Sequence, residues 1–214
     1  MIRAALRLPN LFRLIGFGAC ALALSGCISL LPKTKPSQLY RFGQSAAASA
    51  PGPVGGAVGG TVGVFLTNGS FPNEAAGDRI LIITGGKAAF VAQSRWVAPA
   101  GVLFNEAVAH AFDADTGRVR LISRGQQAKI GYALRLDVRN FETRYDAGPD
   151  AAPRVVVRVR AILTSADLSK TAEQIFEVGT RAGDNRVGAI VSAYDKSLGD
   201  VLGQVVAWTN ANAG

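Results

Sequence analysis

Residues 79–112 read RILIITGGKAAFVAQSRWVAPAGVLFNEAVAHAF, and the order of patterns in this stretch decides the fold class. It opens with two apolar runs, residues 79–84 and 87–92, separated by Gly85 and Gly86. A two-residue glycine link between apolar runs is typical of a tight β-hairpin, because glycine readily adopts the positive φ angles of such turns. We therefore predict a hairpin over residues 79–92.

A helix is predicted to follow this hairpin. Pro99 suits the first turn of a helix, where its missing N–H is not needed. Phe104, Val108 and Phe112 then recur every four residues, which places them on one helical face. The pattern predicts a helix that begins at Pro99 and buries one stripe of its surface.

Further strand patterns lie on both sides of this unit. Residues 61–66 form a short apolar run before it, and residues 132–139 alternate in polarity after it. Alternation with period two indicates a half-buried strand. Strands are also predicted at 118–122, 154–163 and 173–180, with a turn over 146–153.

The last segment predicts a long helix that packs by one face, since apolar residues between Val187 and Val205 follow helical spacing for five turns. The complete order predicts an α+β domain over residues 61–214. Its antiparallel or mixed β-sheet would carry two helices packed on one face, in the order β-β-β-α-β-β-β-α.

The N-terminus has the pattern of a signal peptide. Arg3, Arg7 and Arg13 form a positively charged region, and residues 14–24 after it form an apolar run of eleven. As a helix, eleven residues span roughly 16 Å, about half of a bilayer core, which disfavours a permanent membrane span. We predict that residues 1–26 are a signal peptide.

The apolar run ends in a motif that resembles the lipobox of bacterial lipoproteins: Leu24, Ser25, Gly26 and Cys27. Small residues give the peptidase access to the backbone, and a cysteine thiolate is the nucleophile that takes up a diacylglyceryl group. We expect cleavage before Cys27 and lipid on its sulfur; the alternative is a conventional signal peptide in which this cysteine is incidental. Ile28 is not the aspartate that tends to retain lipoproteins at the inner membrane of enteric bacteria, which favours the inner leaflet of the outer membrane over the inner membrane.

A tether is predicted between the lipid and the domain. Residues 27–60 are rich in Pro, Ala and Gly, and only residues 38–42 resemble a short first strand. The glycines at 55–60 lack the spacing of a phosphate-binding loop, which favours a flexible linker or strand entry over a nucleotide site.

Charge and cysteine content exclude other classes of protein. The formal net charge of +8 falls to +5 without the three arginines of the leader. The remaining basic residues are scattered and often adjoin acids, whereas a nucleic-acid binder clusters them with aromatics, so we expect no nucleic-acid partner. Cys20 lies in the leader, which leaves Cys27 without a disulfide partner in the mature chain.

The sequence offers little for catalysis or metal binding. His110 is the single histidine, and no GxSxG, HExxH or P-loop motif occurs. Asp113 and Asp115 are typical of a turn rather than of a calcium loop, because the EF-hand spacing is missing. We expect no catalytic residues, no enzyme activity, no cofactor and no metal.

One predicted surface is basic. If the apolar residues of 154–163 point into the core, four arginines would lie on the outward face of two neighbouring strands: Arg135, Arg139, Arg158 and Arg160. This face is a candidate for protein docking or for contact with lipid headgroups, and a merely solvated strand face is the alternative.

The residues of the hairpin and helix also resemble a known family. Together with the segment FVAQSRWVAP at 90–99, they are similar to the ABC-type transport auxiliary lipoprotein family. In that family a hairpin leads to an arginine-tryptophan pair closely followed by a proline, here Arg95, Trp96 and Pro99. The likeness covers roughly residues 38–206.

This resemblance implies an αβ periplasmic domain that works with an ABC transporter of lipids. It implies a mammalian-cell-entry domain protein and the transporter ATPase and permease as partners, and it implies no catalysis. We expect Trp96 to fill the junction between hairpin and helix. The favoured function is a non-enzymatic lipoprotein subunit of lipid transport between membranes; the alternative is an outer-membrane structural lipoprotein that braces a barrel protein.

Overall fold

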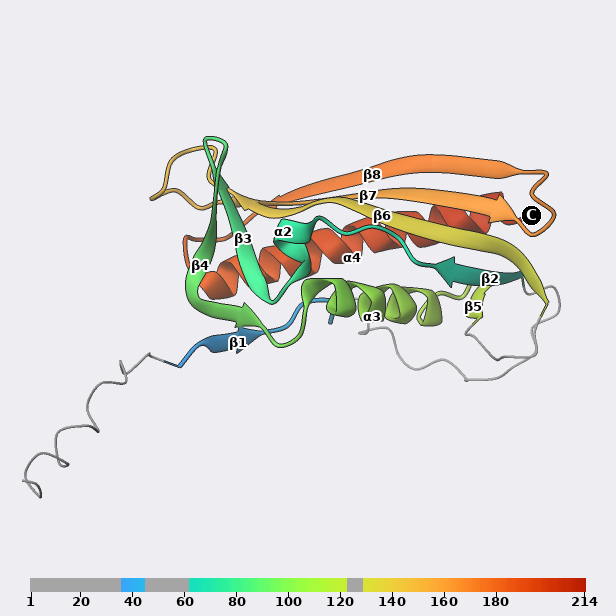
Figure 1. Cartoon of the computed structure of the whole chain (residues 1–214), viewed down its shortest axis with the longest axis horizontal. Coiled ribbons are helices and arrows are strands. Elements are labelled where there is room, and N and C mark those ends of the chain that lie inside the picture. Colours follow the sequence, from blue (N-terminus) through green and yellow to red (C-terminus); the bar gives the residue numbers. More distant parts are fainter. Residues whose placement is uncertain (1–35, 45–61, 123–128) are drawn as a thin grey trace, which may run out of the picture. The chain divides into compact units, whose positions relative to one another are not determined.

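Eight strands form one mixed sheet around the longest strand, β6 (Ile130–Arg144). The structure, a computed structural model, describes residues 36–44, 62–122 and 129–214 (Figure 1). One edge of β6 pairs antiparallel with β7 (Arg154–Ser165), which in turn pairs antiparallel with β8 (Thr171–Arg181). The other edge pairs in parallel with β2 (Val62–Thr67) and then with β3 (Arg79–Thr84).

The remaining strands extend the sheet from β3 and β2. The hairpin partner of β3 is β4 (Lys87–Trp96), and β4 pairs in parallel with the short β1 (Gln38–Tyr40). On the other side β2 pairs in parallel with β5 (Val119–Ile122). The predicted α+β class with a mixed sheet is therefore confirmed, and the hairpin lies where residues 79–92 predicted it.

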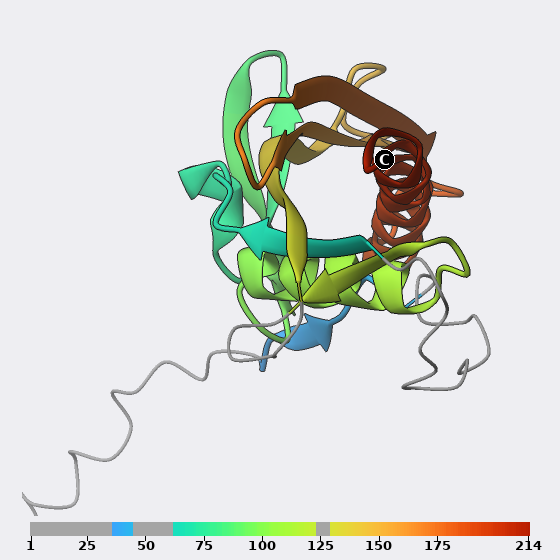
Figure 2. The ribbon, with the colours of Figure 1, turned by 90° about the vertical axis from the view of Figure 1, so that its right-hand side faces the viewer.

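Three helices accompany the sheet: α2 (Asn73–Ala76), α3 (Ala100–Asp113) and α4 (Val187–Asn212). Helix α4 packs against β7 and β8, and α3 packs against α4 and β5. Figure 2 shows that the sheet is strongly curved and that α4 runs along its concave, inner side. The predicted order counted three strands after α3, whereas four follow it, and the four ranges predicted there correspond to β5, β6, β7 and β8. The order also left out β1, which lies within the candidate strand at 38–42, and α2, whose single turn is too short to produce a periodic pattern.

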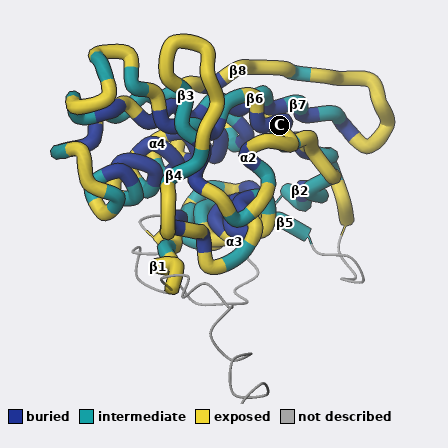
Figure 3. The backbone as a smooth tube through the Cα atoms, turned by 60° about the vertical axis from the view of Figure 1, so that its left-hand side comes forward, coloured by how far each residue is buried: buried dark blue, intermediate teal, exposed yellow. Residues whose placement is uncertain are grey.

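The buried hydrophobic residues form one core between the sheet and the two long helices. Figure 3 marks the buried positions along the backbone in dark blue. Along β6 the inward residues are first even-numbered, such as Leu134 and Leu136, and then odd-numbered, such as Phe141 and Thr143. A bulge between Val138 and Asn140 causes this switch, because one extra residue shifts the alternation by one position. The simple period-two pattern of the sequence therefore ends at the bulge.

An aromatic cluster joins the N-terminal segment, the hairpin, β6 and α4. Trp96 is buried, and its ring lies edge-on to Phe42 at 4.8 Å and to Tyr194 at 5.2 Å between centroids. Phe141 packs on Phe42 at 5.0 Å and on Tyr194 at 4.7 Å. Because Phe42 follows β1 and is buried in this cluster, the folded body begins near Ser37. The rest of the predicted tether lies outside the described residues.

Candidate interaction surface

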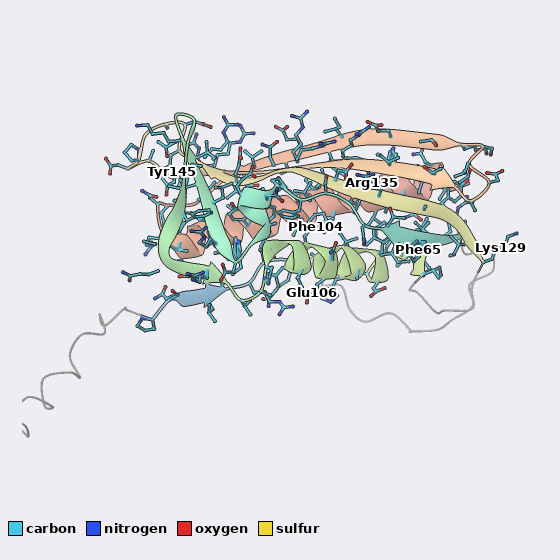
Figure 4. All side chains as sticks on the ribbon, in the orientation of Figure 1. Phe65, Phe104, Glu106, Lys129, Arg135 and Tyr145 are labelled. Carbon is cyan, nitrogen blue, oxygen red and sulfur yellow. The ribbon has the colours of Figure 1, made fainter. Side chains whose placement is uncertain are left out.

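The outer face of β6, β7 and β8 carries an array of charged side chains that the strand register brings together (Figure 4, where Arg135 is labelled). Val155, Val157 and Val159 of β7 point inward and are fully buried, so the residues between them point outward. Arginines outnumber carboxylates on this face: it carries Arg135, Arg139, Arg144, Arg154, Arg158, Arg160 and Arg181 against Asp137, Glu142, Glu173 and Glu177.

Three of the four predicted arginines make ion pairs on this face. Arg160 donates from Nε and Nη2 to the two carboxylate oxygens of Glu173, both at 2.6 Å. Arg158 Nε lies 3.4 Å from Glu177 Oε2 without hydrogen-bond geometry. The guanidinium of Arg160 holds the pKa of the Glu173 carboxyl below its ordinary value, so this pair stays ionised at neutral pH.

Arg139 occupies a different position from the other three. It lies at the bulge of β6 and is exposed, and its charge acts on Glu173 from across the face. The sequence analysis named four of the seven arginines of this face, and it did not predict that carboxylates of β8 would lie among them. That pattern depends on the register between β7 and β8, in which Arg158 lies opposite Glu177.

Asp137 is the one buried carboxylate of the outer face. Its Oδ1 accepts hydrogen bonds from the backbone N–H of Ser70 at 2.8 Å, from the Ser70 hydroxyl at 2.9 Å and from Arg135 Nε at 3.0 Å. Burial raises the pKa of Asp137, but these donors outweigh burial and leave the pKa below its ordinary value of 3.8. Asp137 thereby fixes the chain that leaves β2 to the edge of β6.

Gly69 explains why this chain can approach β6 so closely. A Cβ atom at residue 69 would overlap the carbonyl oxygen of Leu136, and the carbonyl of Ser70 accepts a hydrogen bond from the backbone N–H of Val138 at 2.8 Å. Sequence reasoning missed this contact. Its only local signal is the pair Gly69-Ser70 after an apolar strand, and its partner lies 67 residues away.

The other predicted positions occupy the end of the hairpin and the start of α3. Arg95 donates from Nη1 to both carboxylate oxygens of Asp78, at 3.0 and 2.9 Å. Pro99 lies at the N-terminus of α3, and its carbonyl accepts the backbone N–H groups of Val102 and Leu103 at 2.9 and 3.1 Å. The lipobox, Leu24, Ser25, Gly26 and Cys27, lies outside the described residues.

His110 and Asp113 lie in the last turn of α3, and Asp115 follows the helix. His110 lines a hollow of about 250 Å³ with Arg41 and Glu106, which form an ion pair at 2.6 Å. Asp115 accepts hydrogen bonds from Gly117 N–H at 3.0 Å and from Asn210 Nδ2 at 2.8 Å, as a turn-forming residue does. Within the described part of the chain, no group of three or more His, Cys, Asp or Glu side chains is placed to hold a metal ion.

A family model for ABC-type transport auxiliary lipoprotein components matches residues 66–206. This match covers the hairpin, α3, the outer face and most of α4. The chain belongs to this family. It is thus a lipoprotein component associated with ABC-type transport, in a family of auxiliary subunits rather than enzymes, and the family implies a membrane-associated periplasmic location.

Solved structures support the fold of this auxiliary lipoprotein. A crystal structure of a DUF330 protein from Xanthomonas campestris is 22% identical, with a TM-score of 0.66, over 81% of this chain and 95% of that one. A second crystal structure, of an uncharacterised protein, is 11% identical with a TM-score of 0.62 over 81% of this chain and 99% of that one. No curated protein matches the chain. None of the described helices is long and apolar enough to cross a membrane.

Proposed function

We propose that the mature chain is a non-enzymatic auxiliary subunit of an ABC-type lipid transport system, anchored by lipid on Cys27 and facing the periplasm. The match to the auxiliary lipoprotein family carries this proposal. This match begins at residue 66 and does not include the N-terminus. The proposed anchor is supported instead by the lipobox at residues 24–27. Two or three acyl chains hold a protein at a membrane far more firmly than one chain does.

The signal peptide of residues 1–26 would be removed when Cys27 is acylated. Because Ile28 follows the acylated cysteine, we place the anchor in the inner leaflet of the outer membrane. From there the domain would meet a transport complex that spans the periplasm.

The partner that we propose is a mammalian-cell-entry domain protein, which would be the substrate-binding component of the transporter. The transporter would also contain an ATPase and a permease. The outer face of β6, β7 and β8 is the docking surface in this proposal. Helix α4 covers the inner side of β7 and β8, so the side chains that these strands offer to a partner are those of their outer side. The excess of arginines on this face fits an acidic partner surface.

Ion pairs within the face support such a role. Glu173 holds Arg160 in place before any partner arrives, so little side-chain entropy is lost when a partner binds. Arg139, at the bulge, presents its guanidinium to solvent. Arginine is also enriched at protein interfaces because its planar group binds carboxylates with two parallel hydrogen bonds.

The second candidate is a structural lipoprotein of the outer membrane that braces a barrel protein. A lipid anchor and a small αβ domain would serve that function as well. The two candidates differ in the partner that each requires, so a partner experiment separates them.

The test is extraction of the tagged full-length protein in mild detergent, followed by mass spectrometry of the proteins that remain bound. We expect a mammalian-cell-entry protein together with a transporter ATPase or permease. The Cys27→Ala variant is the control, and it should lose the lipid mass from the N-terminal peptide and leave the membrane fraction. Recovery of a barrel protein alone would favour the structural candidate.

A further inference from the structure

Three large apolar side chains are exposed where the chain enters the folded body. Leu39 of β1 is 65% exposed, and Val97 and Val102 are each 48% exposed. Leucine and valine normally lose their contact with water when a protein folds. Among the described residues, the other large apolar side chains with comparable exposure, Ile130, Leu168 and Ile175, lie on β6 or on the β7–β8 hairpin.

The topology brings these three residues together. Leu39 is in register with Arg95 on the parallel strand β4, and Val97 follows two residues later. The backbone N–H of Val97 donates to the carbonyl of Tyr40 at 2.8 Å, which holds the end of β4 against β1. Val102 lies in the first turn of α3, whose first residue comes three positions after Val97. Figure 1 shows β1, the end of β4 and the start of α3 side by side. We refer to Leu39, Val97 and Val102 as the entry patch.

The length of the preceding chain limits how far this patch can be from the anchor. Nine residues, 28–36, separate Cys27 from Ser37, where the folded body begins. The ten Cα-to-Cα steps from Cys27 to Ser37 span at most about 35 Å even when the chain is fully extended, and Leu39 follows two residues after Ser37. A domain held by lipid on Cys27 therefore keeps the entry patch within reach of the leaflet that holds the lipid.

The charges around the patch suit a lipid surface. Arg95 and Arg41 flank Leu39, and each has a carboxylate partner, Asp78 and Glu106 respectively. Each of these two acids is therefore compensated by an arginine, which reduces its repulsion of anionic headgroups. The connecting stretch also contains Lys33 and Lys35, and basic residues next to a membrane attract anionic lipids.

We propose that the entry patch rests on the phospholipid leaflet that holds Cys27, with Leu39 and Val102 in the headgroup region. This inference depends on the lipid anchor of the proposed function. It sets the orientation of the domain: the β1 side faces the lipid, and the turn between β7 and β8, at the far end of β6, points away from it. The outer face is then left open to a protein partner.

The test uses the full-length lipidated protein in vesicles of phosphatidylethanolamine with a minority of phosphatidylglycerol. Single cysteines are introduced by Leu39→Cys and Val102→Cys, and each is labelled with an environment-sensitive fluorophore, since the sulfur of Cys27 is already acylated. The matched control is Leu168→Cys, because Leu168 is 78% exposed and lies in the β7–β8 turn. Quenching is measured with lipids that carry a nitroxide near the headgroup.

We expect labels at residues 39 and 102 to be quenched roughly twofold or more relative to the label at residue 168, since an apolar surface on a bilayer sits about 5–10 Å into the headgroup boundary. Equal quenching at the three positions, or greater quenching at residue 168, overturns the inference. If the protein floats with the vesicles in that case, the lipid anchor of the proposed function still stands. If the protein does not float with the vesicles at all, the anchor itself is wrong, and the proposed function loses its lipid.

Discussion

The two faces of β7 differ in the interactions that their side chains make. The inner face consists of buried valines, Val155, Val157 and Val159, and α4 packs against it. The outer face carries Arg158 and Arg160 in ion pairs with β8. Burial of apolar area contributes roughly 25 cal/mol per Å², whereas an exposed ion pair contributes about 0–1 kcal/mol. The inner face therefore stabilises the fold, and the outer face can serve recognition at little cost in stability.

The largest effect is expected from the aromatic cluster on the inner side. Trp96→Ala should lower the free energy of unfolding by about 3–5 kcal/mol, because it removes a buried ring and leaves a cavity. Ile175→Ala is the control on the outer face, where the side chain is half exposed and the change should stay within about 0.5 kcal/mol. Urea unfolding of both variants measures the difference. Equal losses would remove the distinction between the two faces.

Asp137 is expected to be the exception on the outer face. Asp137→Ala leaves the N–H of Ser70 and the guanidinium of Arg135 without their acceptor and should cost about 1–3 kcal/mol. Glu177→Ala, which removes a more exposed carboxylate of the same face, should cost at most about 1 kcal/mol.

The contribution of Asp137 should also depend on pH. Its pKa in the folded protein lies below 3.8, so the stabilisation is complete above pH 3.8 and is lost as the pH falls through the folded pKa. Wild type and Asp137→Ala should therefore converge in stability under acid. A constant difference between them at every pH would contradict the ionised network.

A smaller effect is expected from the hydroxyl of Tyr194, which accepts a hydrogen bond from Thr143 Oγ1 at 3.2 Å. Tyr194→Phe keeps the ring contacts and should cost about 0.5–1.5 kcal/mol at neutral pH. Burial raises the pKa of Tyr194 above its ordinary value of 10, so wild type should lose more stability than Tyr194→Phe as the pH rises above 10. Denaturant unfolding across this range measures the effect, and parallel pH curves would show that the hydroxyl is not buried in solution.

The smallest effect on stability is expected from Arg160→Ala. Its guanidinium and the Glu173 carboxylate are both substantially exposed, so the change should be about 0–1 kcal/mol. Arg186→Ala is a matched control, since Arg186 also pairs with a carboxylate but lies at the start of α4, off the outer face. Thermal unfolding of the two variants should give nearly the same midpoint.

Local patterns predicted most elements but not the contacts between distant ones. Gly85 and Gly86 marked the hairpin, and the spacing of Phe104, Val108 and Phe112 marked α3. The parallel pairing of β2 with β6 joins residues more than 60 positions apart, and no local pattern encodes such a pairing. The ion pairs of Arg158 and Arg160 depend in the same way on the register of β8 against β7. The sequence analysis therefore predicted arginines on this face but not the carboxylates that pair with them.

The most direct test of the account measures partner binding and stability on the same variants. Full-length Arg158→Ala/Arg160→Ala protein is compared with Arg186→Ala in detergent extraction, with the captured mammalian-cell-entry protein quantified by mass spectrometry. The account predicts roughly tenfold less captured protein for the outer-face variant, because rim and interface arginines contribute to recognition, with unchanged membrane association and an unfolding free energy within about 1 kcal/mol of the control. Equal capture by both variants would contradict the claim that the outer face is the docking surface.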